Sequence, residues 1–237
     1  MIKKLKIMEK IVVLTGAGIS AESGIKTFRD ADGLWEGHDV YEVATPEGFR
    51  KNPALVLKFY NDRRRQLFDV KPNAGHTALV ELEKQYKVTI ITQNVDDLHE
   101  RAGSSHVIHL HGELRKSRSS MNPNLIYECL EDIVLGDKAD DGSQLRPHIV
   151  WFGEDVPMIH YAAQAVSEAN IVIVIGSSMQ VYPAAGLVGY AHGQTEIYYV
   201  DPKPALNHEL KLRRNLTVIA EPATTGVRKV VDKMLLD

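Results

Sequence analysis

Cysteine is almost missing from this chain, since Cys129 is the only one among 237 residues. A single thiol cannot close an intramolecular disulfide and cannot supply a four-cysteine zinc site. Long hydrophobic runs are missing as well, because no stretch approaches the roughly 18 to 20 apolar residues of a membrane helix. The basic start MIKKLKIMEK is followed by too short an apolar stretch for a signal peptide. We therefore expect a cytoplasmic protein without a membrane partner.

A strong excess of charge is also lacking. The net charge is -3, which gives no electrostatic reason to expect nucleic acid as a partner. Hydrophobic residues make up 44% of the chain, which is ordinary for a globular protein. The length suits one sizeable domain, or a large domain with a small satellite. The sequence contains neither an internal repeat nor a low-complexity linker.

Residues 11–35 carry the first functional signal. The apolar run at residues 11–15 predicts a buried strand, and it leads directly into Gly16-Ala17-Gly18-Ile19-Ser20-Ala21. This is a G-x-G-x-x-A pattern, which lets the backbone turn sharply and approach a pyrophosphate. A plain tight turn is the alternative. The acidic residue expected about twenty positions further on in a dinucleotide fold is absent, because a polar, loop-like stretch stands there.

The order GAGIS-A-x-SGI followed by TFR resembles the signature of the sirtuin family, NAD-dependent protein deacylases. Lys26 stands where that family usually has proline, which predicts a less rigid loop. The resemblance implies NAD as the cofactor. The residues that it assigns to NAD in this stretch are Gly16, Ala17, Gly18, Ser20, Ala21, Phe28, Arg29 and Trp35.

A second predicted strand, residues 88–92, ends in polar residues. Ligands bind at the carboxyl ends of strands in open α/β sheets, although Asn94 and Asp96 could equally cap a helix. The run TQNVDDLH resembles the second sirtuin signature. It implies that Gln93, Asn94, Val95 and Asp96 contact the nicotinamide and its ribose, with Asn94 and Asp96 also serving catalysis.

Two histidines alternate along residues 106–112, which places His109 and His111 on one side of a strand. A bidentate metal site and ordinary hydrogen-bonded histidines are both alternatives, but a metal would need a third ligand and none is conspicuous. The sirtuin resemblance implies that His111 is the general base. The usual pKa of histidine, near 6.5, suits removal of a proton from a ribose hydroxyl.

Further cofactor contacts follow two later strands. The most apolar run, residues 171–175, predicts a central strand and ends in Gly176-Ser177-Ser178, which resembles a third nucleotide contact of the family. Asp201 follows the next strand and is expected to accept hydrogen bonds from the adenosine ribose, although the family more often has asparagine there. Ala223 is expected near the adenine.

A helix is predicted from Pro53 to about Asp69, capped by Asn52. Its run of arginines, residues 63–65, is open to interpretation as a solvated charge run. Tyr60 and Arg63 are nevertheless spaced i, i+3, so that a phenol and a guanidinium can grip one carboxylate. This Tyr-x-x-Arg pair resembles the acyl pocket of a sirtuin subclass that removes succinyl and similar groups. Ala44 corresponds to the small residue that leaves room for the acyl chain.

The stretch LRPHIVWFGE resembles the edge at which sirtuins bind the substrate peptide, by addition of an extended strand. An ordinary core strand is the alternative. The residues expected to contact an acyl-lysine protein or peptide here are Val150, Trp151, Phe152, Gly153 and Glu154.

Most sirtuins hold a small module with zinc, and the single cysteine excludes that arrangement here. No metal is therefore expected. Structural zinc contributes on the order of 10 kcal/mol to folding, so another interaction must hold residues 113–147. We expect the apolar residues of this interval to pack on the main body. They are Leu125, Ile126, Tyr127, Leu130, Ile133, Val134 and Leu135.

Strands alternating with helices predict an α/β protein with a Rossmann-like, doubly wound and mostly parallel sheet. Residues 1–35, 72–112 and 148–237 would form the NAD-binding domain, and residues 36–71 and 113–147 a small domain made by two insertions. The resemblance covers nearly the whole chain and implies a deacetylase and desuccinylase or demalonylase. The acyl-lysine oxygen would attack the nicotinamide ribose, giving nicotinamide, lysine and O-acyl-ADP-ribose.

Other functions remain open at this point. Because the zinc cysteines are missing, the alternatives are a weak NAD-binding module and an NAD hydrolase or ADP-ribosyltransferase. A hydride-transferring dehydrogenase is disfavoured by the absent early ribose acid.

Overall fold

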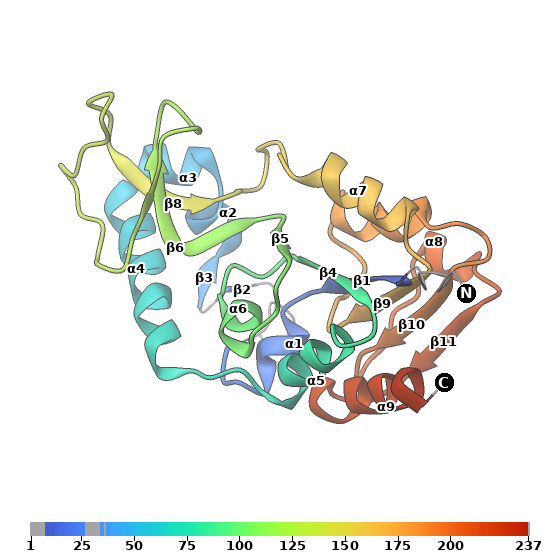
Figure 1. The fold of residues 1–237 in the computed structure, drawn as a ribbon. Coiled ribbons are helices and arrows are strands. Elements are labelled where there is room, and N and C mark those ends of the chain that lie inside the picture. Colours follow the sequence, from blue (N-terminus) through green and yellow to red (C-terminus); the bar gives the residue numbers. More distant parts are fainter. Residues whose placement is uncertain (1–7, 27–33, 36, 237) are drawn as a thin grey trace, which may run out of the picture.

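A six-stranded parallel sheet organises the larger part of the molecule (Figure 1). The computed structural model describes residues 8–26, 34–35 and 37–236. The strand order is β11-β10-β9-β1-β4-β5, and every neighbouring pair is parallel. The strands are β1 (Lys10–Thr15), β4 (Lys87–Thr92), β5 (Val107–His109), β9 (Ile171–Ile175), β10 (Glu196–Val200) and β11 (Leu216–Ile219). The predicted doubly wound α/β fold is confirmed.

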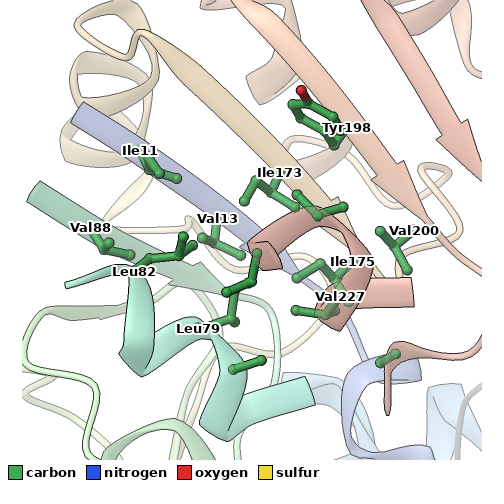
Figure 2. Close-up of a cluster of buried hydrophobic side chains, with 14 of the residues drawn as sticks. Ile11, Val13, Leu79, Leu82, Val88, Ile173, Ile175, Tyr198, Val200 and Val227 are labelled. Carbon is green, nitrogen blue, oxygen red and sulfur yellow. The ribbon is translucent and has the colours of Figure 1, made fainter. Parts of the chain in front are cut away.

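Helices cover both faces of this sheet, and alternate strand residues serve the two faces (Figure 1). Ile11 and Val13 pack toward α5 (Ala74–Leu82) and α9 (Ala223–Leu236), in the cluster that Figure 2 shows. Val12 and Leu14 face the opposite cluster. That cluster includes residues of α7 (Ile159–Ser167), the 3-10 helix η1 (Ala184–Tyr190) and α8 (His208–Lys211). Burial on both faces explains why these strands are continuously apolar.

The remaining elements gather beside this sheet (Figure 1). Helices α2 (Val40–Val43), α3 (Pro46–Lys51) and α4 (Pro53–Asp69) accompany a three-stranded antiparallel sheet of order β7-β6-β8. Its strands are β6 (Gly112–Ser119), β7 (Ile126–Glu128) and β8 (Leu145–Ile149). Shorter elements are α1 (Gly18–Ala21), α6 (Leu98–Ala102), β2 (Leu34–Trp35) and β3 (His38–Asp39). The proposed domain boundaries stay a prediction.

Helix α4 follows the predicted start signals. The side chain of Asn52 accepts a hydrogen bond from the Leu55 amide at 3.1 Å, and Pro53 occupies the first turn. The interpretation of its arginines as a solvated run is wrong for two of them, because Arg63 is 7% and Arg64 1% exposed. Arg65 alone behaves that way, forming ion pairs with Asp62 and Asp132 at the surface.

The expected apolar packing of residues 125–135 is largely wrong. Only Ile133 is buried, whereas Ile126, Leu130, Val134 and Leu135 are between 43% and 56% exposed. Polar groups hold the segment instead. Asn61 donates to the Ile133 carbonyl at 2.9 Å and accepts from its amide at 3.0 Å. The buried Arg64 guanidinium donates to the carbonyls of Leu114 at 2.6 Å and Glu131 at 3.2 Å.

No helix within the described residues is long and apolar enough to cross a membrane.

Candidate active site

The loops that follow β1 and β9 touch each other at their glycines. The Gly18 amide donates to the Gly176 carbonyl at 2.8 Å. A Cβ at Gly18 would lie 2.5 Å from the Gly176 Cα, and Gly176 itself has a φ of +58°. Glycine is therefore required at both positions. The contact lies where the strand order reverses, between β1 and β9, which is the usual ligand position in open α/β sheets.

A buried polar cluster connects the first loop to the end of β4. Ser20 donates its hydroxyl proton to Asp96 Oδ2 at 3.0 Å and accepts from Asn94 Nδ2 at 3.2 Å. The other Asp96 oxygen accepts from the Leu98 amide at 3.1 Å. Burial raises the pKa of Asp96 above its ordinary value, although the bonds from Leu98 and Ser20 oppose the rise. Asn94 and Asp96 lie 74 and 76 residues after Ser20 in the chain, so Ser20 brings the two predicted signatures together.

His111 lies between β5 and β6, with its Nδ1 3.1 Å from the Gln93 carbonyl oxygen. A carbonyl can only accept, so Nδ1 carries the proton and Nε2 keeps its lone pair in the neutral ring. Burial lowers the pKa of His111, while the hydrogen bond to Gln93 opposes this. The imidazole is therefore neutral at pH 7 and able to accept a proton at Nε2.

His109 has a different environment from His111. Its Nε2 lies 2.7 Å from Glu100 Oε1. Burial opposes its charge, but the hydrogen bond and the negative charge of Glu100, with help from Glu113, raise the pKa of His109. Its ring is engaged in an ion pair, and across the described residues no group of three or more His, Cys, Asp or Glu side chains is arranged to hold a metal ion.

The end of β9 joins the same edge. Gln93 Nε2 donates to Ser177 Oγ at 3.2 Å, which links the ends of β4 and β9. Asp201 is 3% exposed, and its Oδ1 accepts from the Lys203 amide at 2.8 Å. Ala223 is the first residue of α9. Ala17, Ala21, Val95 and Ser178 lie beside these groups in the chain, whereas Phe28 and Arg29 fall outside the described residues.

Two buried histidines behind this edge have contacts that the sequence did not reveal. His76 Nδ1 accepts from the Asn73 amide at 3.3 Å, which completes a capping box, and its Nε2 lies 3.5 Å from Ser20 Oγ. His99 Nε2 lies 3.1 Å from Thr15 Oγ1, and the two rings are 5.0 Å apart. The spacing of His76 in the sequence carries no signal of its contact with Ser20.

The predicted acyl pocket residues are brought together in one buried cluster. Tyr60 is fully buried, Ala44 is 3% exposed, and both belong to the cluster that α4 forms with Trp151. The Arg63 guanidinium carbon lies 4.3 Å from the centroid of the Trp35 ring, which is within cation–π range. The Trp35 ring also lies 6.1 Å from that of Tyr60. The structure therefore brings Trp35, a predicted cofactor residue, against Tyr60 and Arg63.

The predicted peptide edge follows β8. The Phe152 amide donates to the Ala44 carbonyl at 2.9 Å, and the Val150 amide donates to the His111 carbonyl at 2.9 Å. The Phe152 side chain is 45% exposed, and Gly153 is exposed as well. Trp151 is only 2% exposed, so its ring packs inside the protein.

Comparisons with known proteins agree with this arrangement. Residues 16–183 match the model of the Sir2 family. A protein of Helicobacter pylori strain ATCC 700392 / 26695, named NAD-dependent protein deacylase, is 59% identical over 228 residues, covering 96% of this chain and 98% of that protein. A protein of the same name from Bacteroides thetaiotaomicron is 56% identical over 229 residues, covering 94% and 97%.

Solved structures are similar over the same length. A crystal structure of a Sir2 homologue in complex with NAD has a TM-score of 0.84 and 39% identity, and the match covers 96% of this chain and 90% of that one. A Sir2 protein bound to an acetylated peptide has a TM-score of 0.78 and 29% identity, with 96% and 94% covered.

Proposed function

Because this chain belongs to the Sir2 family and is an NAD-dependent protein deacylase, we propose that it removes acetyl groups and also succinyl or malonyl groups from lysine side chains. The observation that supports the acidic substrates is the buried pair of Tyr60 and Arg63, one turn apart on α4. A guanidinium with a phenol O–H suits a carboxylate at the end of an acyl chain. Such a contact is worth about 1.5–3 kcal/mol, or roughly ten- to a hundredfold in preference.

The polar side chains at the sheet edge fit NAD. Hydroxyl, amide and carboxylate groups converge there, as the bonds of Ser20 and the link between Gln93 and Ser177 demonstrate. These groups suit ribose hydroxyls and a carboxamide. The contact between Gly18 and Gly176 keeps side chains away from the switch point, so that a pyrophosphate can approach the backbone there. When bound, NAD supplies the ribose carbon that receives the acyl oxygen as nicotinamide leaves.

The chain's own residues then have distinct roles. Asn94 and Asp96 orient the ribose, and the carbonyl of Gln93 holds the His111 ring with Nε2 available. His111 Nε2 takes the proton of the ribose 2′-hydroxyl. The other predicted cofactor contacts, at Gly16, Ala17, Ala21, Trp35, Val95, Ser178, Asp201 and Ala223, remain part of the proposal, as do Val150, Phe152, Gly153 and Glu154 on the peptide side. A cytoplasmic location and a small domain without zinc complete it.

The activity is tested by incubating the protein with NAD and either an acetyl-lysine or a succinyl-lysine peptide. Nicotinamide and deacylated peptide should appear in equal amounts with both peptides. Nicotinamide without deacylation would mean an NAD hydrolase, and neither product would mean a weak NAD-binding module.

The substrate preference is tested by Arg63→Met. The kcat/KM for the succinyl peptide should fall roughly ten- to a hundredfold more than that for the acetyl peptide, because the carboxylate loses its cationic partner. Arg65→Met is the matched control, since Arg65 lies on the surface with Asp62 and Asp132 and should leave the ratio unchanged. Equal losses with both peptides after Arg63→Met would refute the pocket.

A further inference from the structure

A single hydrogen bond determines how the buried Tyr60 hydroxyl can be used. Trp151 Nε1 lies 3.0 Å from Tyr60 Oη, and the two side chains are 2% and 0% exposed. An indole N–H can only donate, so the phenol oxygen is the acceptor. Among the described residues this is the one hydrogen bond that the structure gives to the Tyr60 hydroxyl. The phenol proton is therefore left to be donated to another group.

The phenol keeps that proton at neutral pH. Burial raises the pKa of Tyr60 above its ordinary value, although the Trp151 hydrogen bond and the charges of Arg63 and Arg146 oppose the rise. A protonated phenol can donate a hydrogen bond to an anion that binds beside the Arg63 guanidinium. Burial strengthens such a bond.

The indole that makes this bond is fixed from two sides. The Arg146 guanidinium carbon lies 3.2 Å from the centroid of the Trp151 ring, and the Trp151 amide donates to Glu154 Oε2 at 2.8 Å. Arg146 Nη1 donates to Glu154 Oε1 at 2.7 Å, and Arg118 Nη2 donates to Glu154 Oε2 at 3.1 Å. Glu154 thus fixes both the Trp151 backbone and the Arg146 guanidinium that covers the indole ring, and the indole N–H is directed at Tyr60.

We propose that Trp151 is a specificity-positioning residue, whose indole N–H orients the Tyr60 hydroxyl to donate its proton to the terminal carboxylate of a succinyl- or malonyl-lysine substrate. The inference deepens the proposed function and rests on it. It also gives Trp151 a role inside the protein, distinct from a contact of its ring with the substrate peptide. Without the indole, the phenol O–H can rotate, and part of the preference for acidic acyl groups is lost.

The first test is Trp151→Phe, which keeps an aromatic ring but removes the N–H. The ratio of kcat/KM for succinyl over acetyl peptide should fall about three- to tenfold, mainly through a higher KM for the succinyl peptide. Phe49→Leu is the matched control, because the Phe49 ring packs 5.3 Å from that of Trp151 without bonding to Tyr60. It should lower the melting temperature and leave the ratio within about twofold.

A double-mutant cycle separates positioning from packing. If Trp151 acts through Tyr60, the ratio in the double variant Tyr60→Phe, Trp151→Phe should equal the ratio in Tyr60→Phe alone. Multiplicative losses would overturn the inference, and so would a ratio that Trp151→Phe leaves unchanged. Either result can occur while the wild type removes succinyl groups and Arg63→Met selectively lowers that activity. The proposed function then stands, and only the role of Trp151 fails. A wild type inactive on succinyl-lysine overturns both.

A measurement on the wild-type protein avoids any folding defect of Trp151→Phe. The chain has 2 tryptophans, so a protein labelled with 15N-tryptophan gives two indole N–H signals, which Trp35→Phe assigns. The Trp151 signal should move more with the succinyl peptide than with the acetyl peptide, and Tyr60→Phe should abolish that difference. Equal shifts with both peptides would contradict the proposal.

Discussion

The carboxyl edge of the six-stranded sheet and residues 113–147 are held together by different chemistry. At the sheet edge, fully buried strands bring the loops into contact, and polar groups such as Ser20 and Asp96 bond on top of that apolar base. In residues 125–135 the apolar side chains are mostly exposed, and buried Asn61 and Arg64 hold the backbone at Ile133 and Glu131. An apolar pattern specifies the first region, whereas a few polar side chains specify the second.

Polar side chains connect separate backbone segments in and around residues 113–147. A zinc ion ties distant backbone segments through side-chain ligands. Here the reciprocal bonds of Asn61 to Ile133, and the bonds of Arg64 to two carbonyls, tie α4 to β6 and to the segment that follows β7. These bonds satisfy buried polar groups, but each contributes only about 1–3 kcal/mol.

Removal of His111 should damage catalysis most. His111→Ala should lower kcat about 10²–10⁴-fold, because no other group would take the ribose proton. His109→Gln, two residues earlier, is the control and should cost less than tenfold, since that ring pairs with Glu100. Steady-state nicotinamide release measures both. Full deacylation by His111→Ala, or an equal loss in His109→Gln, would contradict the assignment of His111 as the general base.

The sheet edge should also make the protein sensitive to acid. Burial lowers the pKa of His76 to about 4, below the value near 6.5 expected in the unfolded chain. The folded state thus favours the neutral ring. The contribution of the neutral His76 ring to the free energy of unfolding is complete above pH 6.5. It decreases by about 3 kcal/mol as the pH falls toward 4. His99, whose pKa burial also lowers well below the ordinary value, should add to this loss.

His76→Gln tests the acid effect with little other change. Glutamine at this position of α5 can still complete the capping box with Asn73. Urea unfolding at pH 7, 5.5 and 4 should therefore show a smaller loss of the free energy of unfolding in the variant than in the wild type. Identical pH dependence in the two proteins would show that His76 does not contribute.

The sequence predicted the sheet edge better than residues 113–147 for a physical reason. Strand β9 and the glycine loops follow local patterns of apolar runs and turns, and the rule for strand ends then places Asn94 near Ser20. The contact of His76 with Ser20 depends on packing between α5 and α1, which no local pattern encodes. The burial of Arg64 inside a run of three arginines was likewise invisible, because its partners are two backbone carbonyls and the side chain of Asn61, and none of them is charged.

The smallest effect is expected from one of the two side chains that hold residues 125–135. Asn61→Ala should lower the free energy of unfolding by about 2 kcal/mol, because the buried amide and carbonyl of Ile133 lose their partners. Hydrogen exchange should speed up at residues 130–135 more than in β1. Lys58→Ala, on the same helix, removes an exposed pair with Asp62 and should cost less than about 0.5 kcal/mol. If a chelator destabilised the wild type more than Asn61→Ala does, a metal rather than these polar bonds would hold the segment.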